Sequence, residues 1–183
     1  KERIEEIREE AETSVRQGST CIVLSDKNIT DQNASIPSIL TVGAVHSHLV
    51  KHGLRGYCSL NVECSDALDT HSFAVLIGVG ATTVNPYLAI DSIYQRFEKK
   101  LFGKSDFESC VLKFKKSIDA GLLKIMSKMG ISVISSYRGG CNFEAVGLSR
   151  AIVSDYFPGM SSRISGIGVI GIEKKIKELH ENC

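Results

Sequence analysis

Short apolar runs alternate with amphipathic stretches along most of the chain. The first apolar run, residues 20–24, lies between polar pairs, which is typical of a strand buried on both faces of a parallel sheet. Before it, apolar residues recur at helical spacing from Ile4 to Val15, and Gly18 follows where a helix would end. A polar loop, residues 26–35, continues from the carboxyl end of the strand. The pattern therefore predicts a helix, a strand and a loop in that order.

The same alternation continues through the rest of the chain. It predicts four short strands, at residues 20–24, 57–62, 82–85 and 131–134. It predicts helices at residues 1–17, 37–53, 66–79, 87–100, 105–118 and 121–129, with Gly121 as a kink or break between the last two. Two more helices are expected, one from near Ser149 to Pro158 and one at residues 173–180. Strands that are each followed by a helix indicate an α/β chain with about four short parallel strands and flanking helices.

Such a chain is too short to form a complete eight-stranded barrel. A barrel of eight strand–helix units usually takes about 250 residues. This chain has 183 residues, of which 43% are apolar, and that is enough for one good hydrophobic core. We therefore expect an incomplete, half TIM-barrel-like domain that occupies residues 1–183 as a single unit.

The loop expected after the fourth strand is the main candidate for a site. It holds Ser136, Tyr137 and Arg138 before two glycines, and a further helix is expected to begin at residues 142–145, where Glu144 lies. In α/β proteins, loops at the carboxyl ends of strands are where sites are usually built. Arg138 could hold a phosphate or a carboxylate, but one arginine without a second donor makes a poor anion site. We favour an ion pair, for example with Glu144, that fixes the loop for packing against another domain.

Three histidines, His46, His48 and His52, raise the question of a metal site. His48 and His52 are four residues apart and would share one face of a helix. No carboxylate or cysteine with ligand spacing stands near them in the sequence. We therefore expect hydrogen-bonding histidines and no metal.

A glycine motif at Gly78-Val79-Gly80 gives a weaker signal. It follows an apolar run, as a dinucleotide-binding fingerprint would, but Thr83 stands at the position of the third glycine. We interpret the motif as the end of a helix with close packing around it.

Six cysteines are spread along the chain without a C-x-x-C pair. Buried reduced thiols are expected, because the spacing indicates neither a disulfide framework nor the ligands of an iron–sulfur cluster. Cys141 lies close to Arg138, whose charge would favour a thiolate, yet a packing role is favoured over a reactive thiol.

Charge and hydropathy exclude several classes of partner. The 22 basic and 21 acidic residues nearly balance, so no global field attracts nucleic acid or an anionic membrane surface. The longest apolar run, residues 73–77, is far below the roughly 20 residues that cross a bilayer. The amino-terminal residues are charged rather than signal-like. We expect a soluble cytoplasmic protein.

Several segments, taken in order, resemble the central domain of the large chain of glutamate synthase. They are IPSILTVGAVHSHLVKHGLR at residues 36–55, HSFAVLIGVGATTVNPYLA at 71–89, MSKMGIS at 126–132, SYRG at 136–139, FEAVGL at 143–148 and SRISGIG at 162–168. The resemblance extends from about residue 24 to about residue 172, which is nearly the whole chain.

The resemblance implies a part of an iron–sulfur flavoenzyme that makes glutamate from glutamine and 2-oxoglutarate. In that family an amidotransferase domain releases ammonia, which passes through an internal tunnel to an FMN-binding domain. The central domain, a rudimentary relative of the FMN-binding barrel, joins the two and helps to line the path. Neither the amidotransferase nucleophile nor the FMN and iron–sulfur ligands have counterparts in these residues. We therefore expect a non-catalytic segment without a cofactor of its own, in which the domain-interface or tunnel-wall residues are Ser136, Tyr137, Arg138 and Glu144.

Two functions of other classes remain open. One is a small free-standing α/β enzyme with its site at the Arg138 loop, and the other is a regulatory or scaffold subunit. Glutamate formation by the chain alone would favour the enzyme. Binding of a separate amidotransferase or flavin subunit would favour the scaffold.

Overall fold

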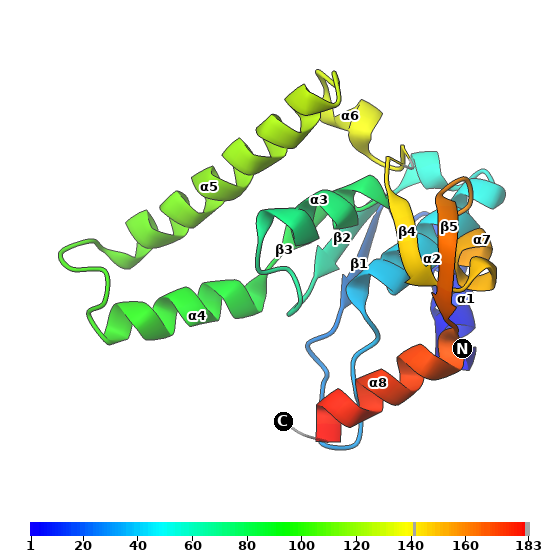
Figure 1. Ribbon diagram of the computed structural model, residues 1–183, viewed down its shortest axis with the longest axis horizontal. Coiled ribbons are helices and arrows are strands. Elements are labelled where there is room, and N and C mark those ends of the chain that lie inside the picture. Colours follow the sequence, from blue (N-terminus) through cyan, green and yellow to red (C-terminus); the bar gives the residue numbers. More distant parts are fainter. Residues whose placement is uncertain (141, 182–183) are drawn as a thin grey trace.

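The computed structural model describes residues 1–140 and 142–181 of the chain (Figure 1). The helices are α1 (Glu2–Arg16), α2 (Ser38–Lys51), α3 (Thr70–Gly78), α4 (Tyr87–Glu98), α5 (Phe107–Lys128), α6 (Ile134–Tyr137), α7 (Arg150–Tyr156) and α8 (Val169–Glu181), with a short 3-10 helix η1 (Arg55–Tyr57). The strands are β1 (Cys21–Ser25), β2 (Ser59–Glu63), β3 (Thr83–Asn85), β4 (Glu144–Leu148) and β5 (Ser161–Ile167).

The first three strands form a parallel sheet in the order β1-β2-β3. In its register, Ile22 of β1 lies opposite Leu60 of β2. Apolar side chains of α1 and α2 pack on these two strands and bury one face of the sheet. The other face is open at β1, where Val23 is 59% exposed. The expectation that this strand is buried on both faces is therefore wrong.

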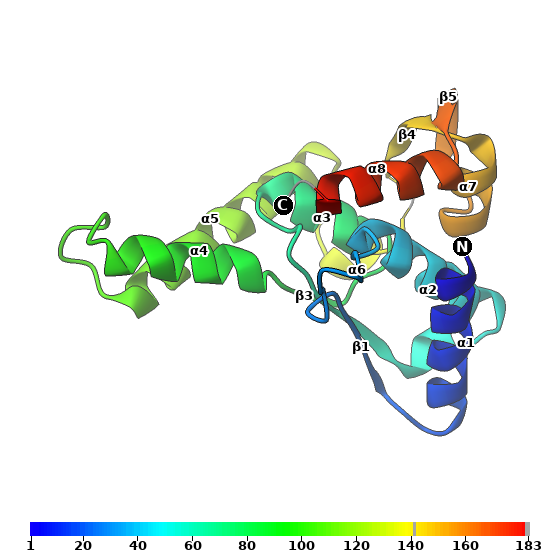
Figure 2. The same ribbon diagram turned by 90° about the horizontal axis from the view of Figure 1, so that it is seen from below.

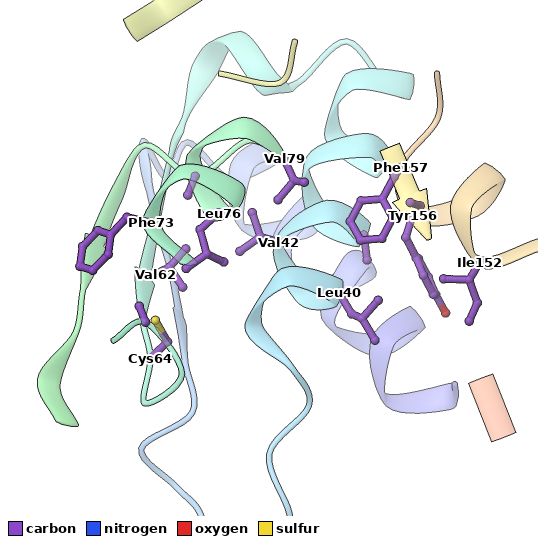
Figure 3. Close-up of a cluster of buried hydrophobic side chains, with 14 of the residues drawn as sticks. Leu40, Val42, Val62, Cys64, Phe73, Leu76, Val79, Ile152, Tyr156 and Phe157 are labelled. Carbon is purple, nitrogen blue, oxygen red and sulfur yellow. The ribbon is translucent and has the colours of Figure 1, made fainter. Parts of the chain in front are cut away.

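The largest cluster of buried side chains connects α2 to the sheet, to α3 and to α7 (Figure 3). Its labelled members are Leu40 and Val42 from α2, Val62 from β2, Phe73 and Leu76 from α3, Ile152 and Tyr156 from α7, and Cys64, Val79 and Phe157 from the segments that follow an element. The cluster makes the carboxyl-terminal α7 part of the same core as the amino-terminal strand–helix units. Burial of these apolar side chains is the main favourable contribution to the free energy that holds α7 against the amino-terminal strand–helix units.

Helices α4 and α5 form a hairpin that projects from the rest of the molecule (Figure 1). The prediction is a kink or a break at Gly121, and the break is wrong, because helix α5 runs through this residue without interruption. A glycine inside a helix costs only about 1 kcal/mol relative to alanine. Here it also allows close approach to α3, because an added Cβ would lie 2.5 Å from Cγ2 of Thr70. The backbone hydrogen bonds of the helix and this contact with α3 outweigh the local preference of glycine for a break.

The fourth predicted strand is wrong. Residues 131–133 have no regular structure, and Ile134 begins the single-turn helix α6. Val133 and Ile134 are 52% and 38% exposed, so the segment is not a buried strand. A run of this length does not by itself distinguish a strand from other structures, and here no neighbouring strand pairs with it among the described residues.

A strand stands instead where a helix was expected to begin. Glu144 opens β4, which pairs in parallel with β5 in a separate two-stranded sheet. The register shifts between Glu144 and Val146 and again before Leu148, so the ladder is irregular. Pairing with a later segment decides this structure, and the local pattern of β4 does not reveal it.

The observed architecture confirms the coarser part of the predicted fold class. The chain is α/β, with short parallel strands and flanking helices. A half TIM-barrel-like arrangement is not confirmed, because the five described strands divide into two separate sheets. Over the residues that the structure describes, each helix is too short or too polar to cross a membrane.

The one-sided burial of the main sheet predicts unequal losses of stability from two truncations. Leu60→Ala removes a fully buried side chain and is expected to lower the free energy of unfolding of the chain by about 2–5 kcal/mol. Val23→Ala on the open face is the matched control and is expected to change it by less than about 1 kcal/mol. Urea unfolding followed by circular dichroism measures both. Equal losses in the two variants would contradict the assignment of the faces.

Candidate functional site

The segment that holds the predicted site residues, which consists of α6 and the residues after it, is anchored by Tyr137. This side chain is 1% exposed and packs edge-to-face on Phe143, with ring centroids 6.0 Å apart. Ala74 of α3 and Met126 of α5 belong to the same buried cluster. Burial raises the pKa of the Tyr137 phenol, and its hydroxyl has no hydrogen-bond partner among the described residues. The buried Tyr137 side chain therefore anchors this segment to the core.

The other three candidate residues lie nearer the surface. Ser136 and Glu144 are exposed, and Arg138 is half-buried. Glu144 pairs with Arg163 of β5, whose Nε lies 3.4 Å from Oε1, and not with Arg138 as expected. This pair is solvent-exposed and contributes little to stability. Its geometry links the two strands of the small sheet.

The charge of Arg138 instead acts on a histidine of α2, His46, and on a second arginine, Arg55. Burial and the positive charges of Arg55 and Arg138 all oppose protonation of the His46 ring and so lower its pKa. Arg55 donates from Nε to Nδ1 of His46 at 3.1 Å. His46 thus accepts a hydrogen bond from one guanidinium group, that of Arg55, and lies within electrostatic reach of a second, that of Arg138, although sequence reasoning considered Arg138 as a lone cation.

Arg55 is fixed by the backbone around it. Its terminal nitrogens donate to the carbonyl of Cys58 at 2.5 Å, to the carbonyl of Gly80 at 2.9 Å and to Oγ1 of Thr82 at 3.2 Å. The side chain therefore joins η1 to the turn between α3 and β3. Sequence reasoning missed Arg55, because nothing in its local pattern shows that the turn after α3 lies beside it.

His46 is neutral at physiological pH. Burial is the main cause that lowers its pKa to about 4, and the charges of Arg55 and Arg138 add to the effect. Because Nδ1 accepts the hydrogen bond from Arg55, the proton of the neutral ring is on Nε2. The ring therefore acts as a hydrogen-bonding bridge and not as a general acid or base near pH 7.

Two glycines leave room for this ring. Gly80 has φ +127°, and a Cβ added there would lie 2.3 Å from Nδ1 of His46. Gly139 has φ +67°, and an added Cβ would lie 2.9 Å from Nε2. The predicted close packing around the motif at residues 78–80 is confirmed, because a Cβ on Gly78 would also lie 2.1 Å from the ring of Phe143.

A cavity of about 150 Å³ adjoins the cluster. Its lining includes His46, Gly78, Gly139 and Phe157. The Nε of Arg138 is buried without a hydrogen-bond partner in the described part of the chain. A buried donor without an acceptor lowers stability.

A larger cavity of about 460 Å³ lies at the carboxyl ends of β1 and β2, where α/β proteins often bind ligands. Its acidic groups are engaged by local donors. Lys27 Nζ lies 2.7 Å from Oε1 of Glu63, and Oδ2 of Asp26 accepts from Ser65 N at 2.9 Å and Oγ at 2.7 Å. These contacts order the loops, although Oδ1 of Asp26 is buried without a hydrogen-bond partner among the described residues.

The cysteines do not gather into a cluster within the described residues. Cys58, Cys64 and Cys110 are buried, and Cys21 is exposed. Burial, with the charge of Asp66, raises the pKa of the Cys64 thiol to about 12, so this group is a protonated thiol at neutral pH. The predictions for Cys141 and Cys183 lie outside the described residues.

Comparisons with known proteins agree with the resemblance found in the sequence. The family profile described as "Glutamate synthase central domain" matches residues 1–149. The glutamate synthase [NADPH] large chain of Azospirillum brasilense is 59% identical over 174 residues, which cover 95% of this chain and 12% of the relative. The corresponding chain of Bacillus subtilis (strain 168) is 42% identical over 176 residues, with 95% and 11% covered.

The name of a third relative gives ferredoxin, where the first two names give NADPH. The ferredoxin-dependent glutamate synthase of Pyropia yezoensis is 39% identical over 194 residues, which cover 100% of this chain and 13% of the relative. The chain thus spans between 11% and 13% of the length of these three relatives.

The contact between Gly139 and His46 can be tested against a glycine of the same conformation. Gly139→Ala and Gly53→Ala share a positive φ of +67° and +69°, but no atom lies within 4 Å of a Cβ at Gly53. Both variants pay a conformational cost of about 1–2 kcal/mol. Gly139→Ala is expected to lose about 1–3 kcal/mol more, because the added methyl group overpacks the ring. Equal unfolding midpoints in urea would contradict the contact.

The low pKa of His46 predicts a pH dependence of stability. Its pKa falls from an ordinary value of 6.5 to about 4, so the unfolded chain binds the proton more readily. Stability is therefore present above about pH 6.5 and is lost as the pH falls toward 4. The loss is on the order of 2 kcal/mol after allowance for solvent screening of a partly exposed ring.

Substitution of the histidine isolates this contribution from that of the carboxylates. We expect His46→Gln to be less stable at pH 7 but to lose less stability than the wild type between pH 6.5 and pH 4. Free energies of unfolding in urea across this range give the difference. Parallel pH profiles for the two proteins would show that His46 does not titrate as stated.

Proposed function

The chain belongs to the glutamate synthase central-domain family, and on that premise we propose that it connects a glutamine amidotransferase domain to an FMN-binding domain in a glutamate synthase. In this proposal it helps to form the path by which ammonia from glutamine reaches the site of glutamate synthesis from 2-oxoglutarate. FMN and the iron–sulfur cluster belong to the neighbouring domains. The chain supplies structure and no catalytic residue.

The observation that carries this proposal is the exposed apolar face of the small sheet. Val146 of β4 and Ile164 of β5 are 64% and 61% exposed. A two-stranded sheet is marginally stable by itself, and apolar surface of this kind commonly marks an interface. Packing of a neighbouring domain on β4 and β5 would bury both side chains.

The Arg138 loop supports the same location. Ser136 lies in α6 and Arg138 follows that helix, while Glu144 opens β4 of the exposed sheet; α6 and β4 lie near each other in Figure 1. Arg138 is half-buried, and a guanidinium group at this position fits a contact with a carbonyl or carboxylate of the neighbouring domain. We propose that Ser136, Arg138 and Glu144 contact that domain and that Tyr137 positions them.

The connecting role predicts that the small sheet is accessible in the isolated chain and covered in the complete enzyme. Ile164→Cys is expected to react with a maleimide in the 183-residue chain and to be protected in the glutamate synthase polypeptide that carries it. Peptide mass spectrometry locates the label. Cys58 and Cys64, which are buried, serve as internal controls that stay unlabelled in both. Equal labelling of Ile164→Cys in both proteins would contradict an interface here.

An activity assay separates this proposal from a free-standing enzyme. The purified chain is mixed with glutamine, 2-oxoglutarate, a reductant and FMN, and glutamate formation and the flavin spectrum are followed. We expect neither turnover nor a spectral shift from the chain alone. Glutamate formation would overturn the connecting role.

A further inference from the structure

A carboxylate and two imidazoles meet between α1 and α2. They belong to Glu12, His48 and His52, and one ligand atom from each lies within 4.8 Å of the others. The Oε2 atom of Glu12 lies 2.6 Å from Nε2 of His48 and 3.8 Å from Nδ1 of His52. The three side chains are only 20%, 19% and 34% exposed, so they form a partly sheltered group at the surface.

The packing of two helices creates this group. His48 lies in the last turn of α2 and His52 follows at its carboxyl end, so the two rings lie on one side of the helix, with centroids 4.3 Å apart and planes tilted by 44°. Helix α1 packs beside α2 and presents Glu12 to them (Figure 2). The sequence argument against a metal depended on the lack of a nearby carboxylate. Glu12, which is 36 residues from His48, supplies that carboxylate.

Neighbouring groups hold the carboxylate and one ring in an orientation suited to ligation. Arg16 donates from Nε to Oε1 of Glu12 at 2.8 Å, which leaves Oε2 directed toward the histidines. Nδ1 of His52 lies 2.8 Å from the carbonyl of His48. Because a carbonyl only accepts, Nδ1 of His52 carries the proton and Nε2 has the lone pair that a metal requires. Such supporting hydrogen bonds are usual around metal-ligating carboxylates and histidines.

We propose that Glu12, His48 and His52 form a binding site for a divalent transition metal of the zinc class. Two imidazoles and one carboxylate are ligands that Zn²⁺ accepts, with the fourth position left to water. Ligand atoms of a tetrahedral zinc site lie roughly 3.3 Å from one another, given metal–ligand distances of about 2.0–2.2 Å. The Oε2 atom of Glu12 and Nε2 of His48, 2.6 Å apart, need to separate by less than about 1 Å to reach that value, and the ligand atoms of all three residues already lie within 4.8 Å of one another.

The metal would cross-link α1 to the carboxyl end of α2. These helices cover the same face of the main sheet, so a bond between them stabilises the cover. The site is separate from the proposed connecting role, since none of its residues belongs to the Arg138 loop or to the small sheet. It can therefore stand if that role fails.

Metal titration of the full 183-residue chain tests the site. Isothermal titration calorimetry with Zn²⁺ is expected to give one site per chain, and Co²⁺ is expected to give the visible absorption of a low-symmetry complex. His48→Gln, His52→Gln and Glu12→Gln should each weaken Zn²⁺ binding by at least about tenfold, since even the loss of a supporting partner costs 10–100-fold. Zn²⁺ should also raise the unfolding midpoint of the wild type but not of these variants.

A histidine elsewhere provides the matched control. His71→Gln alters an exposed histidine near the start of α3 and should leave the affinity for Zn²⁺ unchanged. Circular dichroism and the unfolding midpoint without metal verify that each variant folds, and three separate ligand variants prevent dependence on any one of them. Absence of Zn²⁺ binding by the wild type, or equal binding by the ligand variants and His71→Gln, would overturn the proposal.

Discussion

The burial of α2 on nearly all sides is the constraint on which the rest of the structure depends. Val42, Ala44, Val45 and Leu49 are each fully buried. Val45 and Leu49 pack with α1 and the sheet, while Val42 and Ala44 belong to the cluster that includes α3 and α7. A helix that is apolar around most of its circumference can only be stable inside the protein, so the surrounding elements are placed by the need to cover it.

The same helix also positions both groups of polar side chains discussed above. His46 emerges where α2 meets the turn after α3, and Arg55 and Gly139 close around its ring. His48 and His52 emerge on the side of α1, where Glu12 reaches them. Close packing makes these positions specific: at Gly43, a Cβ would lie 2.3 Å from the ring of Phe157, so even one methyl group would disturb the fit of α7.

Other parts of the molecule are much less covered. Val23 on the open face of the main sheet and Ile170 on α8 are 59% and 85% exposed, and the hairpin of α4 and α5 extends away from the core (Figure 1). An amphipathic element stabilises a protein only when its apolar side is covered. This distribution accords with a chain that covers 12% of the length of its Azospirillum relative. The covered core around α2 and the uncovered periphery thus suit a connecting segment.

The sequence by itself determined the family and most of the local structure. Helical spacing and short apolar runs located α1, α2, α3 and the three strands of the main sheet to within a few residues, because these signals are local. Only the tertiary structure decided that residues 131–134 are not a strand, that β4 pairs with β5, and that β1 has an open face. It also brought Arg55 to His46 and Glu12 to His48. Strand pairs and side-chain clusters of this kind join segments that are distant in the sequence. They are selected by the free energy of tertiary packing, which a local sequence pattern does not reveal.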